Sequence, residues 1–139
     1  MGQAVPHSGT VVLSSGVRVS YVGQETDVPV GTLADYARAQ GVEEHRFKAI
    51  LRKMGFSRAQ LERDASCFST GERRKVLLAA SLCQQAHLYL WDEPLNYIDV
   101  FSRMQIEELL LEAAPSLLFV EHDTAFVNRV ATGVLLVRR

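Results

Sequence analysis

Two adjacent carboxylates follow a short apolar run near the middle of the chain. The run covers residues 88–91 (Leu-Tyr-Leu-Trp), and the carboxylates are Asp92 and Glu93. Four bulky apolar residues in succession predict a strand that is buried on both faces, as in parallel sheets. Ligands of open α/β sheets bind beyond the carboxyl ends of the strands, so the acid pair stands where chemistry is expected. The plain alternative is a buried strand that ends in polar residues.

A second stretch has the residue types of an anion site. Ser69 and Glu72 form a capping box ahead of a helical run that continues to Cys83. The Ser69 hydroxyl, the open backbone of Gly71 and the start of the helix would together suit a phosphate, because free N–H groups and the helix dipole point toward it. The alternative is a well-capped helix without a ligand.

Two further polar residues come just after predicted strands. Gln24 follows the strand expected over residues 17–22, and His122 follows the strand expected over residues 116–120. Each has a plain alternative, a loop residue for Gln24 and a structural histidine for His122. The position of His122 at the carboxyl end of a second buried strand favours a functional role for it, as for the acid pair.

The elements that must position these residues follow from the apolar pattern. Residues 1–26 are expected to hold a β-hairpin over 10–22 with a turn at 14–16, residues 27–66 a small helical subdomain, and residues 67–139 helices alternating with strands, the last at 134–137. Helices are predicted over 36–40 with Thr32 as the cap, and over 43–54, 58–63, 69–83, 99–115 and 125–130. Strands alternating with helices predict a parallel α/β sheet.

Composition narrows the class of protein. The chain has 139 residues, 47% of them hydrophobic, which suits one globular domain. A net charge of −1 gives no electrostatic case for nucleic acid, and the basic run 73–75 is predicted to lie on a solvated helix face. Cys67 and Cys83 have no partner at metal-ligand spacing and are expected as reduced thiols. The absence of a signal peptide or a long apolar run predicts a cytoplasmic protein without membrane insertion.

The order of these motifs resembles the nucleotide-binding cassette of ABC ATPases. In that family, Gln24 corresponds to the Q-loop, residues 68–72 (Phe-Ser-Thr-Gly-Glu) to the signature, residues 88–93 to the Walker B strand with its catalytic glutamate, residues 96–99 (Asn-Tyr-Ile-Asp) to the D-loop, and His122 to the switch histidine. Residues 88–99 together with 102–107 are similar to the second cassette of ABC-F proteins, in the antibiotic-resistance branch that acts on ribosomes and carries no membrane domain.

One motif of that family is absent from the sequence. No G-x-x-x-x-G-K-[ST] occurs, although this loop supplies the backbone cradle and the lysine for the phosphates. The resemblance therefore implies an incomplete P-loop NTPase-like parallel sheet, without its N-terminal strand and phosphate loop, and with a small helical subdomain. We expect the chain to be a fragment of a longer protein, with a degenerate natural protein as the alternative. Alone, it is expected to be inactive as an ATPase and prone to self-association through exposed sheet edges.

The resemblance also implies ligands and roles. The ligands are ATP and Mg²⁺, with Asp92 holding the metal through water and Gln24 sensing both the metal and the attacking water. Glu93 would polarise that water and His122 would contact the γ-phosphate. These are the groups that phosphoryl transfer needs, because it depends on positioning and charge neutralisation.

The signature and D-loop imply a second nucleotide site. Ser69 and Gly71 would bind the nucleotide of a partner cassette, and Asp99 would sit at that interface. The family more often has Gly in place of Thr70 and Gln in place of Glu72. An ionised Glu72 cannot donate a hydrogen bond to phosphate, so we assign it to capping.

Three functional hypotheses remain open from the sequence. The first is part of an ABC-F type ATPase that acts on the ribosome, with its partner cassette in the same parent chain. The second is the ATP-binding subunit of a membrane transporter; residues 63–67 lack the Glu-Gly element typical of exporters, which favours the first hypothesis. The third is a non-catalytic interaction module.

Overall fold

The computed structural model describes residues 8–10, 12–26 and 30–136. Its centre is a parallel sheet of three strands, in the order β1 (Val19–Val22), β2 (Leu88–Asp92) and β3 (Leu117–Val120). Trp91 pairs with Val22 on one side and with Phe119 on the other. The strands are therefore in step, and their carboxyl ends finish at one edge of the sheet. The predicted α/β class is confirmed.

Six α-helices accompany the sheet in the described residues. They are α1 (Leu33–Ala39), α2 (Glu44–Lys53), α3 (Arg58–Glu62), α4 (Thr70–Cys83), α5 (Val100–Ala113) and α6 (Thr124–Val130), with a short 3₁₀ helix at Ala65–Cys67. Several begin at the caps that the sequence predicts: Thr32 accepts a bond from the amide of Asp35, and Ser69 and Glu72 form a complete capping box.

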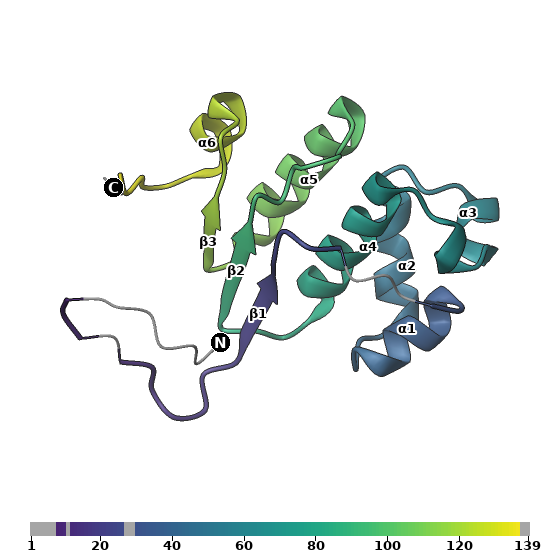
Figure 1. Cartoon of the computed structure of the whole chain (residues 1–139), viewed down its shortest axis with the longest axis horizontal. Helices are drawn as coiled ribbons and strands as arrows, with labels where there is room; N and C mark the ends of the chain where they lie inside the picture. Colours follow the sequence, from purple (N-terminus) through teal and green to yellow (C-terminus); the bar gives the residue numbers. More distant parts are fainter. Residues whose placement is uncertain (1–7, 11, 27–29, 137–139) are drawn as a thin grey trace.

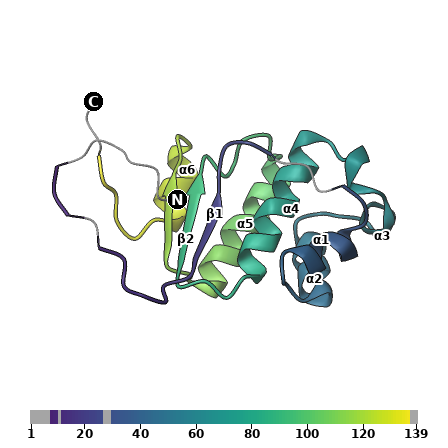
Figure 2. The ribbon, with the colours of Figure 1, turned by 60° about the horizontal axis from the view of Figure 1, so that its bottom comes forward.

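The helices form two groups: α4, α5 and α6 lie next to the sheet, and α1, α2 and α3 form a separate cluster (Figure 1). Helix α4 lies between the strands and the small helices α1, α2 and α3, which cluster on the side away from the chain termini (Figure 1). Figure 2 shows α4 and α5 side by side along the strands. The hydrophobic core runs through both groups, from Phe47 and Leu51 of α2 to Val76 of α4 and Ile106 of α5. Helix α4 is thus the element that joins the helical subdomain to the sheet.

Only one face of the sheet is covered by these helices. On the covered face, the hydroxyl of Ser81 in α4 bonds Ser20 at 2.7 Å and accepts the indole N–H of Trp91 at 2.9 Å. On the opposite face, Tyr21 and Leu118 are more than half exposed. The prediction that the strand over 88–91 is buried on both faces is wrong within the described residues, because its apolar side chains on that second face meet no covering helix.

Two predicted strands are not formed. Val12 and Leu13 are exposed and lie in no strand, so the hairpin predicted over 10–22 is wrong in its described part. Strand β1 pairs with β2, and its other edge has no partner among the described residues. The turn at Ser15 and Gly16 is present. Residues 134–136 are also outside any strand, and residue 137, the last of that predicted strand, lies outside the described residues.

The structure offers no helix that combines the length and apolar character needed to span a bilayer, as judged over the residues described. Both cysteines are free thiols, as expected; Cys67 is exposed and Cys83 is buried.

Candidate functional site

Four of the predicted site residues lie at the carboxyl edge of the sheet. Asp92 ends β2 and Glu93 follows it, Gln24 comes two residues after β1, and His122 comes two residues after β3. The register Asp92–Val120 places the acid pair directly beside the strand that leads to His122. The sequence prediction that these polar residues share one edge is therefore consistent with the geometry.

Glu93 has both a strained backbone and an engaged carboxylate. Its φ is +48°, a left-handed conformation that is costly for a residue with a side chain. Its Oε2 accepts a bond from the side-chain amide of Asn96 at 2.6 Å, and its Oε1 lies 3.5 Å from Nε2 of His122. The strained turn therefore aims the carboxylate across the edge of the sheet, toward the loop that follows β3.

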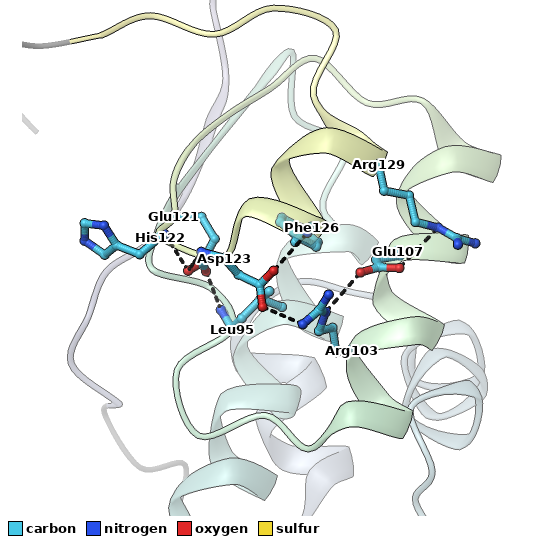
Figure 3. A network of polar contacts seen from close by, with 8 residues as sticks. All are labelled: Leu95, Arg103, Glu107, Glu121, His122, Asp123, Phe126 and Arg129. Atoms are coloured by element: carbon cyan, nitrogen blue, oxygen red, sulfur yellow. Dashed lines mark hydrogen bonds and ion pairs between the residues drawn. The ribbon is translucent and has the colours of Figure 1, made fainter.

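The loop that carries His122 is held by the carboxylate of Glu121 (Figure 3). One oxygen of Glu121 accepts the amides of His122 and Asp123, and the other accepts the amide of Leu95 at 3.2 Å. Glu121 therefore ties the turn after Glu93 to the loop after β3. The sequence analysis did not single out Glu121; its position at the end of a predicted strand was the available signal.

A chain of ion pairs extends this support into two helices (Figure 3). Asp123 accepts the amide of Phe126 and so caps α6, and it pairs with Arg103 of α5. Arg103 also bonds the buried Glu107 at 3.1 Å, which Arg129 of α6 contacts at 3.1 Å. The imidazole of His122 itself is 84% exposed, with Glu93 on one side and solvent around most of the ring.

The signature residues form a second group at the start of α4. Ser69 Oγ accepts the amide of Glu72 at 3.2 Å, and the Glu72 carboxylate accepts the amide of Ser69 at 2.8 Å. Gln60 and Arg63 bind the other carboxylate oxygen. Burial alone would raise the pKa of Glu72, but the hydrogen bonds from Ser69 and Gln60 outweigh it and lower that pKa. The ionised Glu72 is thus committed to capping, as predicted.

Residues 96–99 pack directly against this group. A Cβ added at Gly71 would overlap the backbone carbonyl oxygen of Tyr97, so the close approach requires glycine. Lys75 contacts Asp99 at 2.8 Å, and Asp99 caps α5 through the amide of Ser102. Although burial would raise the pKa of Asp99, hydrogen bonds from Lys75 and Ser102 hold it well below its usual range.

Arg74 connects the signature residues at the start of α4 with the residues at the carboxyl edge of the sheet. Its side chain is fully buried, and its guanidinium donates to the main-chain carbonyls of Gly23 and of residues 92–94. The prediction that the basic run 73–75 lies on a solvated face is wrong for this residue. The signal was available in the spacing: Arg74 lies one turn before the buried Leu78, on the covered side of α4.

A groove beside β1 opens at the same edge. Its volume is about 610 Å³, and its lining includes Gln24, Asp92 and Tyr36. Gln24 and Asp92 offer the oxygen atoms that Mg²⁺ prefers, and Mg²⁺ commonly takes one or two carboxylates while keeping water and phosphate ligands. No cluster of three acidic, histidine or cysteine side chains suited to a metal occurs in residues 8–10, 12–26 and 30–136. Gln24 and Asp92 therefore fit Mg²⁺ as two oxygen-bearing side chains beside one groove.

The model of the family described as "ABC transporter" matches residues 1–96.

Curated relatives match almost the full length of the chain. They include the ATP-binding protein Uup of Caulobacter vibrioides (36% identical, covering 93% of this chain and 21% of that protein), the ribosome protection protein VmlR of Bacillus subtilis (31%, covering 93% and 24%) and the energy-dependent translational throttle protein EttA of Mycobacterium tuberculosis (31%, covering 97% and 26%). The chain thus spans about a quarter or less of each of these relatives.

Solved structures share the fold. An archaeal ribosome recycling factor, in complex with the ribosomal stalk protein, superposes with a TM-score of 0.70 and 25% identity, covering 92% of this chain and 26% of that one. A dimeric bacterial ABC transporter cassette superposes with a TM-score of 0.67 over 82% of this chain and 56% of that one, at 17% identity.

Proposed function

Because the chain belongs to the ABC transporter family of ATPases, we propose that it is part of an ABC-F type ATPase that acts on the ribosome. In this proposal the whole protein binds and hydrolyses ATP between two cassettes of the same polypeptide, in the cytoplasm. The ribosome enters the proposal because two of the relatives are named for ribosome protection and for translational control.

The observation that carries the proposal is the pairing of Glu93 with His122 at the carboxyl edge of the sheet. A carboxylate that accepts from Asn96 and faces an imidazole can orient a water molecule and accept its proton. In this proposal, Glu93 acts on the attacking water and His122 contacts the γ-phosphate during phosphoryl transfer. The exposed imidazole leaves room for that contact.

In this proposal the metal lies at the end of β2, beside the Glu93 turn. Asp92 would hold Mg²⁺ through water, and Gln24, which lines the same groove, would contact the metal and the attacking water. When bound, Mg²⁺ neutralises charge on the phosphate oxygens. The residues of this chain orient the attacking water, and the Glu93 carboxylate accepts its proton.

The second group serves a second nucleotide in this proposal. Ser69 and Gly71 lie at the start of α4, where free amides favour an anion, and Asp99 lies beside them through its contact with Lys75. We assign these residues to the nucleotide bound by the partner cassette. The sequence holds no G-x-x-x-x-G-K-[ST] motif, so this proposal takes the phosphate cradle of each site from outside the 139 residues.

Ribosome co-sedimentation of the full-length protein tests the proposal. A variant with Glu93→Gln, supplied with ATP, should pellet with ribosomes, and the nucleotide-free protein should pellet much less. A matched Glu108→Gln variant, changed on the exposed side of α5, should behave as wild type. Failure to bind ribosomes in any nucleotide state would contradict the ribosomal part, and recovery in the membrane fraction would favour the ATP-binding subunit of a transporter instead.

A further inference from the structure

Arg74 is the largest fully buried side chain in the described structure, and its charge is directed at main chain. Its Nη2 lies 2.6 Å from the carbonyl oxygen of Asp92 and 2.7 Å from that of Glu93. Its Nε lies 3.2 Å from the carbonyl oxygen of Pro94, and its Nη1 donates to Gly23. One guanidinium thus holds three consecutive carbonyls of the acid turn and the residue before Gln24.

This arrangement requires arginine. Guanidinium is a planar fork with five N–H donors, so it can serve four acceptors that lie in different directions. Lysine has three donors on one atom and cannot reach both loops in the same way. Burial lowers the pKa of Arg74, and the nearby carboxylates of Asp92, Glu121 and Glu93 act against that change.

The acid turn needs such a support because its backbone is strained. Glu93 has a φ of +48°, and such conformations persist only where surrounding contacts over-determine them. The carbonyls that Arg74 binds lie before, at and after this residue. A release of those carbonyls would allow the turn to relax and would move the Glu93 carboxylate away from His122.

We propose that Arg74 is a positioning residue, which fixes the Glu93 turn and the Gln24 loop in one relative position from the buried side of α4. The proposal rests on the proposed function for its kinetic consequence, but not for its structural one. Arg74 touches neither nucleotide nor metal in this role. It acts through the backbone that carries the groups that do.

The structural consequence can be measured in this 139-residue chain by hydrogen exchange. With Arg74→Lys, the amides of Glu93, Asn96 and Ile98 should exchange at least about tenfold faster, while the amides of Phe47 and Met54 in the α2 region keep their protection. Arg73→Lys is the matched control, because Arg73 is adjacent and donates to Ser66 rather than to the acid turn. Equal loss of protection in both regions, or no change in the turn, would overturn the proposal.

The kinetic consequence is measured in the full-length protein. Arg74→Lys and Arg74→Gln should each lower kcat at least about tenfold and leave KM for ATP within about twofold, since misplacement of Glu93 affects the chemical step. A folded variant with unchanged kcat, or a KM that rises by the same factor, would overturn the proposal. If Arg74→Gln does not fold, the kcat and KM of Arg74→Lys alone test the proposal. If the wild-type protein hydrolyses no ATP, the proposed function fails, and the exchange result still decides the role of Arg74.

Discussion

The Nε2 atom of His122 lies 3.5 Å from Oε1 of Glu93, although the two residues lie in loops that follow different strands. The strained turn at Glu93 and the Glu121 bridge bring them together, since Glu121 binds both the loop of His122 and the amide of Leu95.

Replacement of Glu93 by glutamine should abolish ATP hydrolysis by the full-length protein. The amide keeps the shape of the side chain but cannot accept the proton of the attacking water, so turnover should fall by about 10²- to 10⁴-fold. ATP should still bind, and the two cassettes should stay closed around it. Phosphate release and retained nucleotide measure these outcomes, with Glu108→Gln as the control. Unchanged turnover would remove Glu93 from its role.

The 139-residue chain alone should hydrolyse no ATP above background. Its sequence lacks the lysine-bearing phosphate loop that supplies most of the affinity for the β- and γ-phosphates. The measurement is phosphate release at millimolar ATP and Mg²⁺. The decisive control is the same chain with Glu93→Gln: robust turnover that this change abolishes would show that the loop is dispensable.

Replacement of Gly71 by alanine should destabilise the chain even without a nucleotide. The added Cβ meets the backbone carbonyl of Tyr97, which cannot yield as a flexible side chain would. Such overpacking costs about 1–3 kcal/mol in the free energy of unfolding, measured by denaturant titration. Gly133→Ala is the control, because nothing lies near its Cβ position. Equal stability of the two variants would assign Gly71 to ligand binding alone.

The contact between Lys75 and Asp99 should make stability depend on pH. Hydrogen bonds lower the pKa of Asp99 in the folded state despite the opposing effect of burial, so the contribution is present above the unfolded pKa of about 3.9 and is lost as pH falls through the folded value. Because Asp99 is 56% exposed, screening limits this contribution to about 1 kcal/mol or less. The gap in unfolding free energy between wild type and Asp99→Asn should therefore shrink between about pH 5 and pH 2; a constant gap would contradict it.

The uncovered face of the sheet should promote self-association of the chain. Tyr21, Leu118 and Val120 are all more than half exposed on this face, next to open strand edges. Light scattering should detect concentration-dependent oligomers, and Leu118→Lys should reduce them. Glu108→Lys, which adds a lysine on exposed α5, is the control. A clean monomer at all concentrations would contradict the prediction.

Local signals in the sequence were sufficient for much of the fold and for the family. The Ser69–Glu72 box and the Thr32 cap depend on contacts within one turn, so their spacing alone predicts them. The family resemblance drawn from motif order is confirmed by the match over residues 1–96. The roles of the site residues stay predictions, because geometry places side chains without showing what they bind.

Long-range contacts account for what the sequence did not reveal. Arg74 looks like part of a basic helix face until the carbonyls that surround it, up to 51 residues away in sequence, are seen. Local alternation predicts a hairpin over 10–22, but the described part of its first strand is not formed, and β1 pairs with β2, a distant partner that no local pattern indicates. The role of Glu121 has a similar origin, since one of its oxygens accepts the amide of Leu95, which lies on a distant segment of the chain.

The start of α4 and the segment 94–99 meet at three successive points: Arg74 on Pro94, Gly71 on Tyr97, and Lys75 on Asp99. These three contacts leave little freedom for the segment 94–99 to move relative to the start of α4. A partner that contacts the exposed Tyr97 would therefore also affect the position of the Glu93 turn, through contacts that do not pass through the strands. Binding of a partner at Tyr97 and the position of the Glu93 carboxylate would then change together.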